Sequence, residues 1–81
     1  MKIEVFGTGC PKCNALEEAA REAADGLGID YELVKVSSIA AMAARGVLLT
    51  PALAVNGEIK VSGKVPPVDR IREMLRNQAP E

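Results

Sequence analysis

The chain's only two cysteines, Cys10 and Cys13, lie in one four-residue stretch, Cys10-Pro11-Lys12-Cys13. Two thiols at this spacing can exchange electrons as a dithiol and a disulfide, or they can bind a soft metal ion as thiolates. The stretch falls where an extended run ends and a helical pattern begins, and this position is more informative than the spacing alone. It is therefore the first candidate for a functional site.

The residues of this stretch favour a reactive thiol at Cys10. Pro11 suits the first position of a helix, where its missing N–H costs nothing, so Cys10 is the expected N-cap. The free amides of the first turn and the positive end of the helix dipole then face the Cys10 sulfur, and Lys12 adds modest help. These effects should lower the pKa of Cys10 below the ~8.5 of a free thiol. Cys13 lies deeper on the same side of the first turn, so it is the expected resolving thiol.

The composition of the 81 residues excludes several other kinds of chemistry. Histidine is absent, which removes Ser/His/Asp and Cys/His catalysis and every histidine-containing metal site. Ten Lys and Arg against eleven Asp and Glu give a net charge of −1, so nothing indicates binding to nucleic acid or to an anionic membrane. No window approaches the ~18 to 20 apolar residues of a membrane span, and the N-terminus lacks the apolar region of a signal peptide. We therefore expect a cytoplasmic protein, where a close cysteine pair is more often redox-active or metal-binding than structural.

Strands and helices alternate around the cysteines. The patterns predict strands at residues 2–6, 29–36, 52–55 and 58–61, and helices from Pro11 to Gly26 or Gly28, from Ser37 or Ser38 to Arg45, and after Pro66-Pro67. The first two strands and their helix should form a right-handed βαβ unit, and Asn56-Gly57 is typical of a two-residue hairpin turn. In the second helix, Ile39, Met42 and Ala43 are the expected buried residues. The order β-α-β-α-β-β-α predicts a single α/β domain over residues 1–81, with residues 78–81 frayed.

Other interpretations of the cysteine pair remain open. A purely structural disulfide is a poor use of so short a loop, because closing it removes only about 2 kcal/mol of unfolded-state entropy. A Cu(I) or Zn(II) carrier is a stronger alternative, since small copper-chaperone domains also place a CxxC pair after their first strand. Those domains resemble β-α-β-β-α-β and usually carry a methionine where this chain has Thr8. A redox-sensing binding module without turnover is the third alternative.

The chain resembles the thioredoxin and glutaredoxin superfamily, and within it the small prokaryotic redox-active disulfide proteins. The matching segments are residues 9–13 with the CxxC pair, residues 46–52 with Thr50-Pro51, Asn56-Gly57, and Gly63 ahead of the last helix. The resemblance implies a four-stranded mixed sheet with the first and third helices on one face and the second on the other. It also implies a cis Thr50-Pro51 peptide beside the cysteines. In the family, the backbone before this proline binds an extended substrate segment, so Thr50, Pro51 and Gly63 are the expected substrate-binding residues.

Three departures from the family pattern concern the substrate and the mechanism. Thioredoxins carry a Trp before the first cysteine, where this chain has Gly9, so the groove should be smaller and less aromatic. The segment Ser62-Gly63-Lys64-Val65 lacks the acidic residue with which glutaredoxins bind glutathione, so glutathione is a weakly supported reductant. Glu4 lies six residues before Cys10, where thioredoxin has a buried aspartate. Burial would raise the pKa of Glu4 and suit it to general-base catalysis, whereas a solvated strand glutamate is the simpler interpretation.

Taken together, the residues and the resemblance predict a cytoplasmic thiol–disulfide oxidoreductase of the protein disulfide reductase type. Cys10 and Cys13 are the expected catalytic residues, with Pro11, Lys12 and Glu4 modulating them. The chemistry requires no cofactor and no metal. The expected partners are a disulfide-bearing protein or small molecule and an upstream reductase, and the expected state is a monomer.

Overall fold

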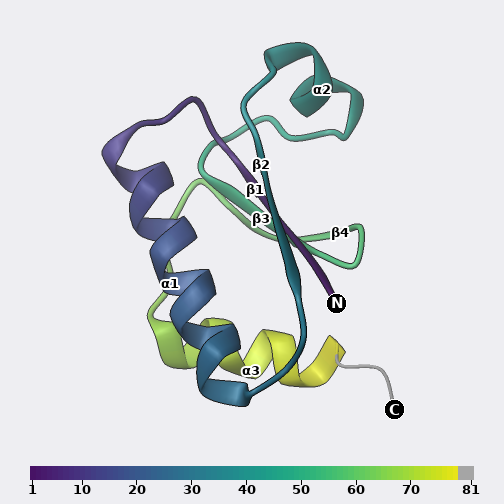
Figure 1. Cartoon of the computed structure of the whole chain (residues 1–81). Coiled ribbons are helices and arrows are strands. Elements are labelled where there is room, and N and C mark those ends of the chain that lie inside the picture. The colour runs from purple at the N-terminus through teal and green to yellow at the C-terminus, as the bar shows by residue number, and fades with distance from the viewer. Residues whose placement is uncertain (79–81) are drawn as a thin grey trace.

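A four-stranded mixed sheet in the order β2-β1-β3-β4 forms the centre of the computed structural model, which describes residues 1–78 (Figure 1). The elements are β1 (Lys2–Phe6), α1 (Pro11–Leu27), β2 (Glu32–Val36), α2 (Ile39–Ala44), β3 (Ala52–Val55), β4 (Glu58–Ser62) and α3 (Val68–Gln78). β1 pairs with β2 in parallel and with β3 antiparallel, and β3 pairs antiparallel with β4. The predicted element order, the parallel βαβ unit and the mixed sheet are confirmed.

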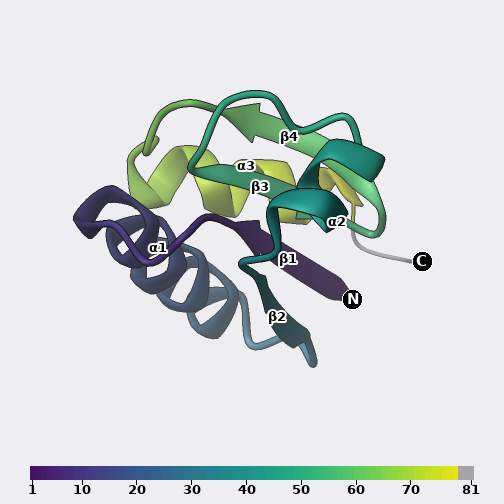
Figure 2. The same ribbon diagram turned by 90° about the horizontal axis from the view of Figure 1, so that it is seen from above.

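The alternation of side chains in β1 divides the core between the two faces of the sheet. Ile3 and Val5 belong to the larger cluster, which α1 and α3 cover, whereas Phe6 packs with Met42 of α2 in the smaller one. Figure 1 shows α2 and α3 at opposite sides of the sheet, and the view from above in Figure 2 agrees. The predicted distribution of helices is therefore confirmed: the first and third cover one face and the second covers the other.

The hairpin between β3 and β4 turns at the predicted dipeptide. Asn56 and Gly57 both have positive φ, at 52° and 88°, as a type I′ turn requires. The Asn56 side-chain oxygen accepts a hydrogen bond from the Lys2 backbone N–H at 2.9 Å, and the Asn56 N–H donates to the Lys2 carbonyl at 2.8 Å. The turn thus also fixes the start of β1.

The second helix differs from the sequence prediction in the face that it buries. Ser38 caps it, since its Oγ accepts a hydrogen bond from the Ala41 N–H at 3.2 Å, but only Met42 of the helix is buried. Ile39 is 74% exposed and Ala43 is also exposed, so their predicted burial is wrong. A helix of six residues has fewer than two turns and contacts the sheet at one point, so helical spacing does not define its buried face.

The start of β2 and the end of α3 also differ from the sequence prediction. β2 begins at Glu32, three residues later than predicted, because Ile29 to Tyr31 connect α1 to the strand instead of pairing with β1. Gln78, which the sequence places in a frayed segment 78–81, is instead the last residue of α3, and residues 79–81 of that segment lie outside the described residues. Within residues 1–78, none of the helices is long and apolar enough to cross a membrane.

Candidate functional site

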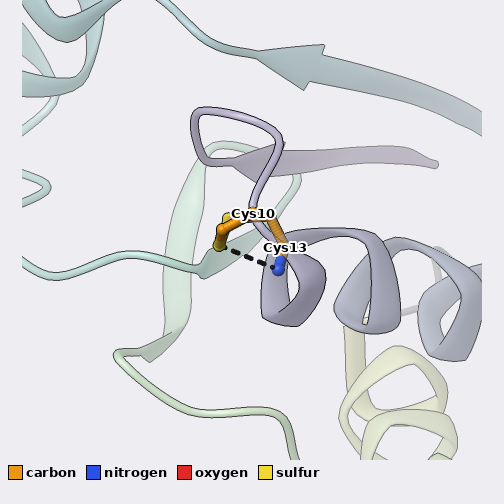
Figure 3. The surroundings of a disulfide bond; sticks show 2 residues. All are labelled: Cys10 and Cys13. Carbon is orange, nitrogen blue, oxygen red and sulfur yellow. Dashed lines mark hydrogen bonds between the residues drawn. A yellow bond between two sulfur atoms is a disulfide. The ribbon is translucent and has the colours of Figure 1, made fainter.

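Cys10 and Cys13 form a disulfide at the N-terminal end of α1 (Figure 3). Cys10 is the N-cap in extended conformation, Pro11 opens the helix, and the Cys10 Sγ accepts a hydrogen bond from the Cys13 N–H at 3.2 Å. The predicted N-cap position of Cys10 is confirmed. The Cys10 sulfur therefore lies at the end of the helix where backbone N–H groups and the dipole stabilise negative charge.

The two cysteines differ sharply in their access to solvent. Cys10 is half-buried and is followed by the exposed residues Pro11 and Lys12, whereas Cys13 is only 5% exposed. Gly7 lies directly against Cys13, and a Cβ added to Gly7 would overlap the Cys13 Sγ. Cys10 is thus the more accessible of the two cysteines to a partner molecule.

Thr50 and Pro51 precede β3 at the same end of the sheet as the cysteines. The peptide bond between them is cis, as the resemblance implied. Phe6, the last residue of β1, pairs with Ala52, so Pro51 lies next to the loop that leads from β1 to Cys10. Pro51 is fully buried and Thr50 is exposed. The register therefore brings Thr50, Pro51 and the cysteine pair to one edge of the sheet.

Gly63 lies beside the same segment. Its N–H donates to the Pro51 carbonyl at 2.8 Å, and the neighbouring Ser62 Oγ donates to the Leu49 carbonyl at 3.2 Å. Gly63 has a φ of 80°, which favours glycine, and a Cβ there would lie 3.3 Å from Leu49 side-chain atoms. The end of β4 thus holds the segment that carries Thr50 and Pro51.

Glu4 is buried, but it is neither the solvated strand glutamate nor the buried general base with a raised pKa that the sequence suggested. It is 5% exposed, so the solvated position is wrong. Arg45 donates to both carboxylate oxygens, at 2.8 and 2.9 Å, and also lies over the Phe6 ring. The hydrogen bonds from Arg45 hold the pKa of Glu4 below its usual value and outweigh burial, which acts to raise it. Because Arg45 and Phe6 lie on the α2 face of the sheet, the structure does not bring Glu4 to Cys13 in α1.

A second charged pair, which the sequence interpretation missed, lies close to the cysteines. A cavity of about 220 Å³ is lined by Cys13, Gly7, Glu17 and Lys35, among other residues. The Lys35 Nζ lies 3.2 Å from the Glu17 Oε1, and Arg21 contacts the Glu17 Oε2 at 3.2 Å. The spacing of Cys13 and Glu17 on one helix face was visible in the sequence, whereas the pairing of Glu17 with β2 was not.

In the described residues 1–78, the cysteine pair does not belong to a larger group of metal-ligating side chains. No group of three or more His, Cys, Asp or Glu side chains within residues 1–78 is placed to hold a metal ion. A disulfide whose Cys10 sulfur accepts a helix N–H, at the same end of the sheet as a cis-proline segment, has the arrangement required for thiol–disulfide exchange.

Comparisons with known proteins agree with this geometry. The family model for the thioredoxin domain matches residues 1–76. A thioredoxin from Methanothermobacter thermautotrophicus is 43% identical over 75 residues, which cover 93% of this chain and 97% of the relative. A thioredoxin from Methanocaldococcus jannaschii is 44% identical over 75 residues, which cover 93% of this chain and 86% of the relative.

A solved structure of thioredoxin 1 from Thermosipho africanus has a similar fold. It superposes with a TM-score of 0.64 over 96% of this chain and 93% of that chain, at 20% sequence identity. The fold is thus shared well beyond the range of close sequence similarity. The family match over residues 1–76 and the two thioredoxin relatives identify the chain as a member of the thioredoxin family of thiol–disulfide oxidoreductases.

Proposed function

We propose that Cys10 is the attacking thiol and Cys13 the resolving thiol of this oxidoreductase. The single observation that carries the assignment is the difference between the two sulfurs at the helix N-terminus. The Cys10 sulfur accepts the Cys13 N–H and lies near the surface, whereas Cys13 is 5% exposed. Lys12 is exposed beside them and adds positive charge at the surface.

In this scheme, reduction of a substrate disulfide takes two exchanges. The Cys10 thiolate attacks one substrate sulfur, the substrate S–S bond breaks, and the first substrate thiolate leaves with its electron pair and takes up a proton. The Cys13 thiolate then attacks the Cys10 sulfur and displaces the second substrate thiolate. The substrate has gained two electrons, and the chain holds the Cys10–Cys13 disulfide that the structure contains.

A disulfide-bearing protein is the proposed substrate, bound at Thr50. Thr50 is exposed beside buried Pro51, and hydrogen bonds from Ser62 and Gly63 fix the surrounding backbone. An extended segment of the substrate would bind along this backbone, as in strand addition. Small-molecule disulfides can also reach Cys10, because they need no such segment.

An upstream reductase is the proposed source of electrons, because the oxidised pair must be reduced before the next cycle. A reducing cytoplasm is the proposed compartment, since thiols are kept reduced there. One chain suffices for the chemistry, because both cysteines and the Thr50-Pro51 segment belong to it, so a monomer is the proposed working state.

Single-cysteine variants test the assignment of roles. Reduced Cys13→Ala should form a stable mixed disulfide with a protein disulfide substrate such as insulin, visible as one added chain mass that dithiothreitol removes. Cys10→Ala should form none under the same conditions. Equal trapping by both variants would refute the roles. If neither variant reacts while the wild type retains Cu(I) or Zn(II) stoichiometrically, a metal carrier would replace the proposal.

A further inference from the structure

The resolving step requires Cys13 to lose a proton in a place that solvent hardly reaches. Only the thiolate attacks a disulfide, and the burial of Cys13 at 5% exposure disfavours its charged form. In the mixed disulfide, the Cys10 sulfur is bonded to the substrate and carries no negative charge that could take this proton. Glu4 is held by Arg45 on the opposite face of the sheet. The proton of Cys13 needs another acceptor.

The cavity beside Cys13 is lined by one group that can accept this proton. It is about 220 Å³ in volume, enough for several water molecules, and its polar lining includes Thr8, Asn14 and Ser37. Of the residues that line it in the described part of the chain, Glu17 is the one carboxylate. Lys35, the other charged residue of the lining, can donate but not accept a proton while it is positively charged.

The fold holds Glu17 toward this cavity from two sides. Cys13 and Glu17 are four residues apart in α1 and therefore share one face of the helix. Lys35 approaches from β2, where it pairs with Val5 of β1, and its Nζ lies 3.2 Å from the Glu17 Oε1. Arg21 donates to the Glu17 Oε2 at 3.2 and 3.3 Å from the following turn. Both carboxylate oxygens are thus fixed, and the Glu17 side chain is only 18% exposed.

The same contacts keep Glu17 ionised at neutral pH. Partial burial acts to raise the pKa of Glu17, but the hydrogen bonds from Lys35 and Arg21 outweigh it and leave the pKa below its usual value. The carboxylate is therefore available as a proton acceptor throughout the neutral range, although its low basicity limits the driving force for transfer.

We propose that Glu17 accepts the thiol proton of Cys13, through water in the cavity, as Cys13 resolves the mixed disulfide. The proton passes from the Cys13 sulfur to the Glu17 carboxylate, and the Cys13 sulfur forms a bond to the Cys10 sulfur. The bond between Cys10 and the substrate breaks, and the substrate thiolate leaves with the electron pair. Lys35 is a positioning residue that keeps Glu17 against the cavity. The proposal rests on the cysteine roles proposed above.

The two exchanges can be timed separately with the chromogenic disulfide 5,5′-dithiobis(2-nitrobenzoate). Mixing it with the reduced protein at near-equal concentrations releases one thionitrobenzoate when Cys10 attacks and a second when Cys13 resolves. The first phase depends on reagent concentration, whereas the second does not. Glu17→Gln should slow the second phase about tenfold or more at pH 7 and leave the first unchanged. The deficit should shrink as the pH rises, because hydroxide then removes the Cys13 proton.

Glu18→Gln is the matched control, because Glu18 is exposed on the same helix and does not line the cavity. It should leave both phases and their pH profiles unchanged. An unchanged first phase in Glu17→Gln also shows that the variant folds, since this phase requires the N-cap geometry of Cys10.

Two results would overturn the role of Glu17. One is a second phase in Glu17→Gln that is as fast as in the wild type or faster. The other is a slow second phase in Lys35→Met together with a normal one in Glu17→Gln, which would assign Lys35 to stabilising the Cys13 thiolate. Failure of the cysteine roles is distinguishable, because Cys10→Ala would then keep a rapid first phase.

Discussion

Arg45 binds Glu4 through two hydrogen bonds, at 2.8 and 2.9 Å, across 41 residues of sequence. Glu4 lies in β1, one of the two inner strands, and Arg45 is the C-cap of α2, just before the segment that leads to Thr50 and Pro51. The ion pair therefore ties the connection that precedes the proposed substrate-binding segment to the middle of the sheet. Its contribution is to stability and position, since Glu4 faces away from Cys13.

Removal of Arg45 should destabilise the protein. Arg45→Met leaves the buried Glu4 carboxylate without its cation, so the free energy of unfolding should fall. The loss should be smaller than at a fully buried ion pair, because the Arg45 side chain is 35% exposed. Urea denaturation of the oxidised protein measures the loss. Arg70→Met at an exposed position is the control, and an equal effect of the two substitutions would contradict a stabilising pair.

The same pair should make stability depend on pH on the acid side. The pKa of Glu4 is lower in the folded protein than its ordinary value of 4.5, so the folded state binds this proton less readily than the unfolded state. The stabilisation is then complete above about pH 5 and is lost as the pH falls through the folded-state pKa. Glu4→Gln should reduce the fall in unfolding free energy that the wild type shows below about pH 5. Parallel curves for wild type and variant would show that Glu4 does not contribute.

A methyl group at Gly7 should disturb the cysteine pair directly. Its Cβ would overlap the Cys13 Sγ and lie 2.8 Å from the Cys13 Cβ, so Cys13 or the loop must move. Gly7→Ala should lower the unfolding free energy of the oxidised protein by about 1–3 kcal/mol, as overpacking does elsewhere. Thr8→Ala, at the exposed neighbouring position, should change it by less than about 0.5 kcal/mol. Equal effects of the two substitutions would mean that the close approach of Gly7 to Cys13 is unimportant.

Lys12 should have only a small influence on the reactivity of Cys10. Its side chain is exposed, whereas the helix N-terminus supplies fixed N–H groups, one of which contacts the Cys10 Sγ at 3.2 Å. Alkylation of reduced protein by iodoacetamide across pH should give Cys10 a pKa below ~8.5. Lys12→Gln should raise that pKa by less than about 0.7, in line with a surface charge at a helix end. A rise of more than one unit would make Lys12 the main source of thiolate stabilisation.

Local sequence signals predicted the parts of the fold that depend on neighbouring residues. Pro11 after Cys10 marked the helix start, and Asn56-Gly57 marked the hairpin, because each fixes backbone geometry within a few residues. The cis geometry of Thr50-Pro51 came from family resemblance, since an X-Pro dipeptide alone favours trans.

Contacts that depend on tertiary packing could not be predicted from local sequence patterns. The Glu4–Arg45 pair joins residues 41 apart, and the Glu17–Lys35 pair joins a helix to a strand, so neither follows from a local pattern. The burial of Glu4 does not follow from the sequence for this reason, because an isolated strand glutamate is usually solvated. The exposure of Ile39 does not follow from helical spacing, because a helix of six residues contacts the sheet at only one point.

A redox titration of the metal-free protein against glutathione and dithiothreitol buffers, with thiol alkylation and mass spectrometry as the readout, tests the redox function of the cysteine pair most directly. We expect one reversible two-electron transition that involves Cys10 and Cys13 alone, at a potential within reach of the cytosolic thiol pool. A pair that stays reduced until strongly oxidising conditions, or that becomes protected from alkylation only when Cu(I) or Zn(II) is added, would rule out the redox function.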